Sequence, residues 1–324
     1  TLEVTTKPNR EDVLFGWREV LVGLGFSEIM SNSLTKASYA ELVSDRDLQP
    51  ESSVLMLNPL SNDLAAMRQS LVFQGLEAIA RNTNHQHPDL RLFEFGRTYV
   101  RTNEEDDEAP AFRETEHLSL FVTGREFPES WNRPKGKEGM ATLYTMKHAV
   151  EVLLERVGLT VVSDPEVSQD GLVLEGVTLR NLHGNEIGRW GLVQPAVAKS
   201  CGVEAPVFWA DFQVAQLWKA VKKRKIKAQD LSKFPSVRRD LALVVDQNVS
   251  YEHLRQTAAS AEKKLLTDIQ LFDVYQGKGL ESTEKSYAMS FRLQHDSATL
   301  TDKQIEAAMD RILRALENEG ARLR

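Results

Sequence analysis

Hydrophobic residues recur at intervals of three and four along parts of the chain, and this spacing predicts helices. The first predicted helix covers residues 11–24, and Gly25 follows it as a left-handed stop. Two more are predicted, one from Ser70 to the polar segment NTNHQHPD and one over residues 143–157, before Gly158. Shorter apolar runs predict strands at residues 28–34, 54–57, 91–100 and 118–124.

Three further stretches are rich in β-forming residues and are separated by turn residues: LVLEGVTLR, EIGRWGLV and VFWADFQV. Short strands joined in this way favour antiparallel pairing. Residues 1–222 are therefore expected to form a largely antiparallel sheet flanked by helices, in an α+β domain.

The last 94 residues, 231–324, have a sharper pattern. Strands are predicted at 239–245, 269–277, 285–293 and 321–324, and helices at 250–266 and 301–320. Ser250 caps the first of these helices, and Thr301 with Gln304 forms a capping box at the second, which Gly320 ends. The order β-α-β-β-α-β is that of a ferredoxin-like domain.

In such a domain both helices cover one face of the sheet, so alternate side chains of each strand divide between the core and an open face. Phe272 and Val274 suit the core, which places Leu271, Asp273 and Tyr275 on the open face. In the next strand the predicted core set is Tyr287, Met289, Phe291 and Leu293. The predicted open-face set is Ser286, Ala288, Ser290 and Arg292.

This open face suits the binding of an unpaired RNA base. The ring of Tyr275 would stack on the base, an interaction worth about 1–3 kcal/mol, while Asp273 and Ser286 hydrogen-bond to the base edge. A purely structural interpretation is also open, in which Tyr275 belongs to the fold and Asp273 pairs with Arg292 across the sheet.

The charge of the chain is uneven. Residues 231–324 hold 14 Lys+Arg and 14 Asp+Glu, so residues 1–230 carry the whole net charge of −7. Between the two parts lies KAVKKRKIK, residues 219–227. We interpret residues 223–230 as a basic linker; alternatively, Lys222, Lys223, Arg224 and Lys225, together with Arg292, contact RNA phosphates.

Composition excludes several classes of protein. No apolar run approaches the roughly 18 residues of a membrane span, and the single Cys201 cannot form an intrachain disulfide, so a cytoplasmic protein without a membrane partner is expected. The histidines are scattered and there is no Cys pair, so no metal site is predicted. The chain begins at Thr1 without an initiator Met, and we expect a fragment of a longer protein.

Several motifs together resemble a known family. FPSVRRDLALVV, LFDVYQGKGL, KSYAMSFRLQ, TLTDKQI and GARLR resemble the anticodon-binding ferredoxin-fold domain of the bacterial phenylalanyl-tRNA synthetase β subunit. LNPLSNDLAAMRQSL and RLFEFGRTYV resemble the catalytic-like module of the same subunit. The resemblance extends over almost the entire chain.

This resemblance implies a class II synthetase-like antiparallel sheet for residues 1–222 and an anticodon-binding domain for residues 231–324. It implies a catalytic α subunit as partner, in an α2β2 heterotetramer, and tRNA(Phe) as ligand. The first anticodon base would stack on Tyr275, with Asp273 and Ser286 beside it. No cofactor is expected in this chain, and ATP and Mg²⁺ are expected in the holoenzyme through the α subunit.

The module is predicted to have no catalytic residues. Amino-acid activation requires fixed arginines and Mg²⁺-binding carboxylates. Arg68 and Arg97 could imitate the second class II signature, although Arg68 equally suits a helix cap or a pair with a carboxylate. The third signature is a glycine-rich strand and helix with an arginine. It is missing from ADFQVAQLWKA, where it should appear. Two alternatives stay open: a free-standing class II-like ATP-using enzyme and an orphan RNA-binding paralogue.

Overall fold

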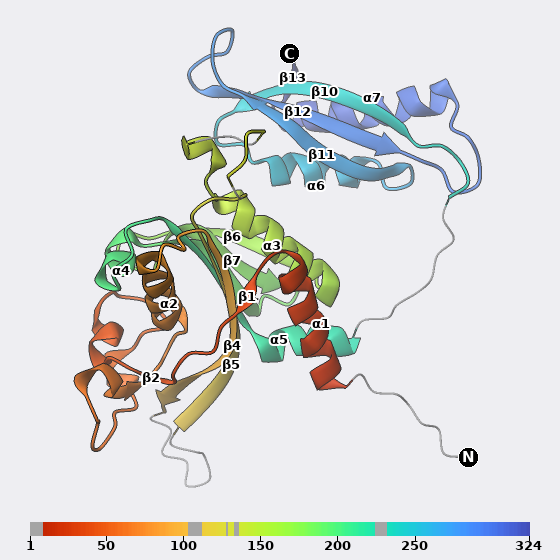
Figure 1. Cartoon of the computed structure of the whole chain (residues 1–324). Coiled ribbons are helices and arrows are strands. Elements are labelled where there is room, and N and C mark those ends of the chain that lie inside the picture. The colour runs from red at the N-terminus through yellow and green to blue at the C-terminus, as the bar shows by residue number, and fades with distance from the viewer. Residues whose placement is uncertain (1–8, 103–111, 128, 133–135, 224–231) are drawn as a thin grey trace, which may run out of the picture. The chain divides into compact units, whose positions relative to one another are not determined.

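A computed structural model describes residues 9–102, 112–127, 129–132, 136–223 and 232–324 (Figure 1). The chain divides into two compact units, residues 1–225 and residues 226–324. Each unit has its own sheet and its own hydrophobic core, so each is considered separately below.

The larger unit is built on a sheet of seven strands. In spatial order they are β1 (Ser27–Glu28), β4 (Leu90–Arg101), β5 (Phe112–Thr123), β9 (Val207–Gln213), β8 (Glu186–Val193), β7 (Val173–Asn181) and β6 (Val161–Val167). All neighbours pair antiparallel except β1 and β4, which are parallel. A short ribbon of β2 (Leu34–Thr35) and β3 (Ala66–Met67) lies outside this sheet.

Helices cover both faces of the large sheet, and a separate core fills each side (Figure 1). One face packs against α1 (Arg10–Gly23), α3 (Leu143–Val157) and α5 (Val214–Lys223). The other packs against α2 (Val72–Asn84), α4 (Pro195–Ser200) and the short 3-10 helix η1 (Ala37–Glu41). Three more 3-10 turns, η2 (Pro50–Ser52), η3 (Asn62–Leu64) and η4 (Gly136–Gly139), complete the unit.

The prediction of a flanked α+β sheet is confirmed, and the three helices predicted for this unit begin and end close to the predicted residues, whereas α4 and α5 were not predicted. The prediction of a strand at residues 54–57 is wrong. Leu55 makes only an isolated bridge to Ala66, and Leu57 is 94% exposed. The run lies beside β3, which has only two residues, so the pairing does not extend beyond this bridge. Strand β6 was not predicted because Ser163, Asp164 and Pro165 interrupt its apolar residues and most of the strand is exposed.

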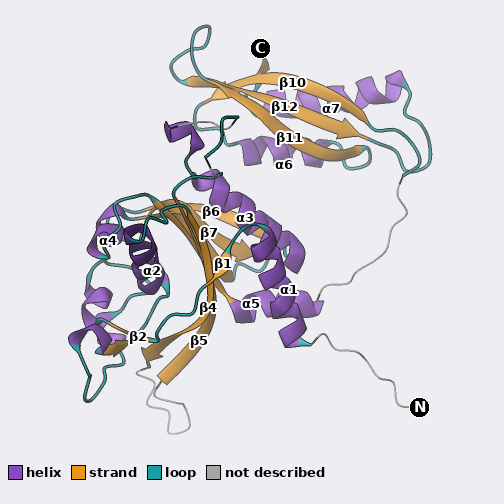
Figure 2. Cartoon of the chain, in the orientation of Figure 1, coloured by secondary structure: helices purple, strands orange, loops and turns teal. Residues whose placement is uncertain are grey.

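The smaller unit has the predicted β-α-β-β-α-β order. Its elements are β10 (Val237–Asp246), α6 (Tyr251–Ala261), β11 (Leu266–Tyr275), β12 (Glu284–Leu293), α7 (Asp302–Asn318) and β13 (Arg322–Leu323). The sheet order β11-β12-β10-β13 is that of a ferredoxin-like fold. Figure 2 shows both helices on one side of the sheet, and their buried faces share a core with β10 and β12. The other face of the sheet is not covered by either helix.

Two predicted boundaries change in the structure. Helix α6 ends at Ala261 rather than at residue 266, because Glu262 is extended (φ −134°, ψ 92°) and its carboxylate accepts hydrogen bonds from the next backbone N–H groups and from Arg311. Helix α5 continues to Lys223, so Lys222 and Lys223 belong to the last helix of the larger unit. Arg224 and Lys225 lie outside the described residues.

Across the described ranges, no helix is both long enough and apolar enough to cross a membrane.

The contact between α2 and β5 depends on the absence of a side chain at Gly75. A Cβ added there would lie 2.1 Å from the Phe121 ring, whereas a Cβ at Gly16 of α1 would meet nothing closer than 3.8 Å. We expect Gly75→Ala to lower the free energy of unfolding of the larger unit by about 1–3 kcal/mol through overpacking. Gly16→Ala, the matched mid-helix control, should raise it by about 0.5–1 kcal/mol.

Urea unfolding followed by tryptophan fluorescence measures this difference, because all five tryptophans lie in residues 1–225. Equal stabilities of the two variants would contradict the packing described for α2.

Candidate functional sites

Strand pairing defines the open face of the smaller unit. The side chains of Leu243, Tyr287, Met289 and Phe291 enter the core beneath the helices, so the residues that alternate with them point to the other face. In this register Tyr275 pairs with Ser286, which pairs with Val244. Asp273 pairs with Ala288, which pairs with Ala242. The three residues predicted to form the base-binding site are therefore on one face, in two adjacent rows of cross-strand neighbours: Tyr275 and Ser286 in one row, and Asp273 in the next.

A β-bulge in β11 corrects the prediction for its apolar residues. The register shifts between Leu271 and Asp273, so Leu271 pairs with the buried Met289 and packs against the core. Phe272, predicted to be buried, is 53% exposed. Val274, also predicted for the core, pairs with Tyr287 but remains half exposed, because β11 is an edge strand. Strict alternation fails here since a bulge inserts one extra residue.

The Tyr275 ring is held by contacts with two other segments. Its hydroxyl donates to the Lys278 carbonyl oxygen over 3.1 Å, and the guanidinium carbon of Arg324 lies 4.5 Å from the ring centroid. The Arg324 backbone N–H donates to the Ala242 carbonyl oxygen. Between Arg324 and β11 the sheet carries only the small side chains of Ala242 on β10 and Ala288 on β12. Arg324 therefore makes a cation–π contact with the Tyr275 ring.

Asp273 and Ser286 differ in accessibility. Asp273 is exposed, whereas Ser286, on a central strand between Tyr275 and Val244, is only 2% exposed. Arg292 is exposed on the same face, and in the part of the chain that the structure describes no ion pair joins it to Asp273. The structural alternative of an Asp273–Arg292 pair is therefore wrong, and both charged groups face solvent.

In the larger unit, Arg68 is part of a buried ion pair. Its Nη1 lies 2.9 Å from Glu94 Oε1 and donates to Ser31 Oγ over 2.7 Å, while Nε donates to the Arg97 carbonyl oxygen. Arg97 itself points to the surface and contacts Glu114 at 3.1 Å. Of the two arginines that imitate the second class II signature, one is neutralised inside the protein and the other is exposed.

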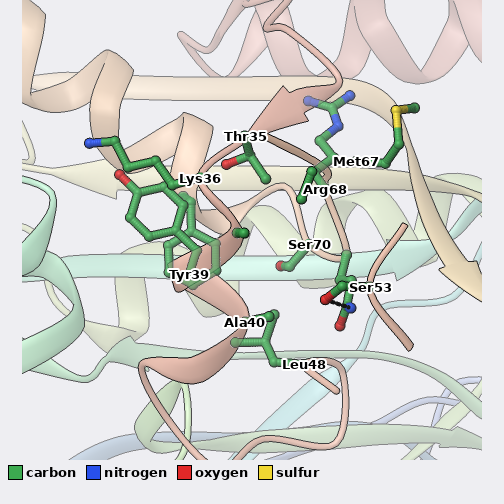
Figure 3. Close-up of a pocket in the computed structure, with 13 residues that line it drawn as sticks. Thr35, Lys36, Tyr39, Ala40, Leu48, Ser53, Met67, Arg68 and Ser70 are labelled. Atoms are coloured by element: carbon green, nitrogen blue, oxygen red, sulfur yellow. Dashed lines mark hydrogen bonds between the residues drawn. The ribbon is translucent and has the colours of Figure 1, made fainter. Parts of the chain in front are cut away.

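Figure 3 shows the small pocket next to Arg68, lined by Tyr39, Leu48 and Ser70 among others. Tyr39 stacks on Phe73 with ring centroids 4.3 Å apart. The cavity volume is only ≈ 10 Å³, about what one water molecule requires. A nucleotide does not fit here.

A second, polar pocket of ≈ 350 Å³ lies against β4, β5 and β9, and most of the charged groups that line it make ion pairs. His117 Nδ1 lies 2.6 Å from Asp211 Oδ2, and the Ser119 hydroxyl also donates to Asp211. Behind this pocket, Arg189 makes two hydrogen bonds to Asp45, of 2.6 and 3.0 Å, and an ion pair to Asp47. These acidic groups are already occupied by protein cations.

Burial and pairing act in opposite directions on the pKa values of these groups. Burial favours neutral His117, but the charge and hydrogen bond of Asp211 together raise the pKa of His117 above its usual 6.5. Burial also opposes ionisation of Asp211, yet His117 and Ser119 hold the pKa of Asp211 below 3.8. The pair is therefore an imidazolium–carboxylate pair at mildly acidic pH. Within the described ranges, no three His, Cys, Asp or Glu side chains are arranged to hold a metal ion.

Comparisons with known proteins agree with both units. Residues 4–214 match the model of the phenylalanyl tRNA synthetase beta chain CLM domain, and residues 232–324 match that of the ferredoxin-fold anticodon binding domain. The chain belongs to the phenylalanyl tRNA synthetase beta chain family. The family resemblance seen in the sequence motifs is thus confirmed, and so is the expected α+β fold, a largely antiparallel sheet with flanking helices followed by a ferredoxin-like domain.

Individual relatives give the same assignment. The phenylalanine–tRNA ligase beta subunit of Bacteroides fragilis is 40% identical over 312 residues, which are 94% of this chain and 37% of that protein. The corresponding subunit of Pseudomonas syringae pv. tomato is 34% identical over 301 residues, covering 93% of this chain and 36% of that protein. The chain thus spans little more than a third of the length of these relatives.

Among solved structures, a pyrrolysyl-tRNA synthetase of Desulfitobacterium hafniense is similar, with a TM-score of 0.49, 14% identity, and coverage of 67% of this chain and 70% of that one.

Sequence reasoning missed several residues of this family member that the structure brings to its sites. Phe272 was misplaced because nothing in LFDVY signals a bulge. Arg324 reaches Tyr275 only because β13 pairs with β10. The Arg189–Asp45 and His117–Asp211 pairs join residues 144 and 94 positions apart, and spacing along the chain cannot find such pairs.

The Arg68–Glu94 pair should be important for stability because both side chains are almost fully buried, at 3% and 2% exposure. Removing one partner leaves an uncompensated buried charge, so we expect Glu94→Gln to lower the free energy of unfolding by about 3–5 kcal/mol. Glu114→Gln is the matched control, because the Arg97–Glu114 pair is exposed and should contribute only about 0–1 kcal/mol. Urea unfolding detected by tryptophan fluorescence measures both, and a Glu94→Gln loss no larger than that of the control would refute this role.

The His117–Asp211 pair should make stability depend on pH. The raised His117 pKa contributes stability that is complete below pH 6.5 and is lost as the pH rises through the folded-state pKa. The lowered Asp211 pKa contributes stability above about pH 3.8 that is lost on acidification. The decrease in the free energy of unfolding caused by His117→Gln should therefore be larger near pH 5.5 than at pH 8.5.

Unfolding free energies measured at both pH values test this expectation, with the exposed His148→Gln on α3 as the control. A loss that is the same at pH 5.5 and pH 8.5 would show that the charge of His117 does not contribute.

Proposed function

We propose that this chain is the part of a phenylalanine–tRNA ligase beta subunit that supports the catalytic alpha subunit and binds the anticodon of tRNA(Phe) during ATP-dependent aminoacylation. The smaller unit is the tRNA-binding part. The larger unit is a scaffold without catalytic residues of its own. The assembly is an α2β2 heterotetramer in the cytoplasm.

One observation carries the anticodon assignment. Tyr275, Asp273 and Ser286 lie in two adjacent rows on the sheet face that the helices leave open, in the unit that matches the anticodon-binding family model. A sheet face with an accessible aromatic ring and polar neighbours is the surface on which several RNA-binding folds stack unpaired bases, and Tyr275 is half-exposed. Arg292 is exposed on the same face and supplies a cation for the RNA backbone.

The scaffold assignment rests on how the charges of the larger unit are used. Transfer of an adenylyl group needs arginines and metal-binding carboxylates that are free to meet a triphosphate. Arg68 and Arg189 are instead buried against Glu94 and Asp45, and Asp211 is bound to His117. ATP and Mg²⁺ are therefore assigned to the alpha subunit, and the phenylalanine pocket with them.

Replacing the ring of Tyr275 tests the anticodon site. We expect Tyr275→Ala to weaken binding of tRNA(Phe) by the 324-residue chain about fivefold to 150-fold, the range that corresponds to loss of one stacked base. Tyr275→Phe is the matched control and should retain most of the affinity, because it keeps the ring and loses only the hydroxyl that donates to Lys278. Fluorescence anisotropy with labelled tRNA measures both, and unchanged affinity of the Ala variant would remove Tyr275 from the site.

The two alternatives predict different outcomes. A free-standing ATP-using enzyme would catalyse phenylalanine-dependent ATP–pyrophosphate exchange without an alpha subunit, and such turnover would refute the scaffold assignment. An orphan RNA-binding paralogue would fail to capture a phenylalanine–tRNA ligase alpha subunit when the two are co-expressed. Stable capture together with exchange activity only in the complex is the result we expect.

A further inference from the structure

Phe272 lies on the open face of the smaller unit, although the sequence pattern assigns it to the core. The guanidinium carbon of Arg238 is 5.2 Å from the centroid of its ring. Arg238 pairs with Arg292, and the neighbouring pairs on either side contain the buried Phe291 and Leu293, so the side chain of Arg238 is on the open face. The ring of Phe272 that it contacts is therefore on the same face as Tyr275.

The bulge creates this arrangement. With regular pairing, Leu271 and Asp273 would share one side of β11 and Phe272 would point to the other. The register shift puts Leu271 into the core and gives both Phe272 and Asp273 to the open face, opposite Ala288. Bulges often re-aim a side chain at a functional site. Here the bulge exposes an aromatic ring that a regular strand would bury.

The spacing of the two rings suits successive nucleotides. Phe272 and Tyr275 are three positions apart on one strand, which corresponds to roughly 7–10 Å along it. Open sheet faces that bind single-stranded RNA use two or three aromatic side chains to stack successive bases. Between the two rings lies the exposed carboxylate of Asp273, which can accept hydrogen bonds from a base edge.

The charges around Phe272 favour a nucleotide over an apolar ligand. Asp240 holds Arg238 in place through two hydrogen bonds of 2.8 and 3.2 Å. Arg292 is the cross-strand neighbour of Arg238, and its guanidinium has no ion pair with any residue in the part of the chain that the structure describes. Arg238, which lies next to the exposed ring, and Arg292, its neighbour across the strand, can contact the phosphate of a base stacked on that ring.

We propose that Phe272 is a second stacking platform, which binds the unpaired loop nucleotide next to the one stacked on Tyr275, with Arg238 and Arg292 facing its phosphate. This inference rests on the proposed anticodon-binding function. It adds a second base contact, made by Phe272, which the bulge in β11 places on the open face.

The test uses the 324-residue chain and the anticodon stem-loop RNA of tRNA(Phe), with single loop positions made abasic in turn. Phe272→Ala should weaken binding of the intact stem-loop about fivefold to 150-fold. One abasic position should abolish the effect of Phe272→Ala, and the neighbouring abasic position should abolish that of Tyr275→Ala. Val274→Ala is the control, because this half-exposed residue pairs with Tyr287 on the helix side and should leave affinity unchanged.

The outcomes separate this inference from the function on which it rests. If Tyr275→Ala weakens binding and Phe272→Ala does not, the second platform is wrong and the anticodon site stands. If neither variant weakens binding, the anticodon-binding function itself fails. If Phe272→Ala weakens binding equally at every abasic position, or no more than Val274→Ala does, its effect is structural and the second platform is wrong.

Discussion

The pairing of β12 with both of its neighbours is the constraint on which the smaller unit depends. Its alternate residues Tyr287, Met289 and Phe291 are buried beneath the two helices, so a shift of one position would expose the core. That requirement fixes which side chains of β10 and β11 face away from the helices. The face proposed to bind RNA is therefore a consequence of core packing, which places Tyr275 opposite Ser286 in the pairing of β11 with β12.

In the larger unit, several charged side chains pair with one another inside the protein. Arginines and carboxylates that would serve catalysis if they were free are paired inside the protein, as Arg68 with Glu94 and Arg189 with Asp45. Buried pairs of this kind contribute little net stability, but they are costly to break, so they hold β4, β8 and the preceding loops in one arrangement. Such a sheet suits the scaffolding role proposed for this unit.

The two units thus differ in where their charged and polar groups lie. In the larger unit Arg68, Arg189 and His117 pair with carboxylates inside the protein, while the sheet is covered by helices on both faces. In the smaller unit one sheet face is left without a helix, and its exposed groups, Asp273, Phe272 and Arg292, keep their capacity to bind a ligand.

The sequence by itself determined the element order of the smaller unit, the capping box at Thr301, and the placement of Tyr275, Asp273 and Ser286 on one face of the sheet, because periodicity and capping act over a few neighbouring residues. Tertiary structure alone decided the exposure of Phe272, the contact of Arg324 with Tyr275, the burial of Ser286 and the pairing of His117 with Asp211. Each of these depends on which strand lies beside which, and on one extra residue in an edge strand. Such long-range pairing is settled by the packing of the whole sheet, and no local pattern encodes it.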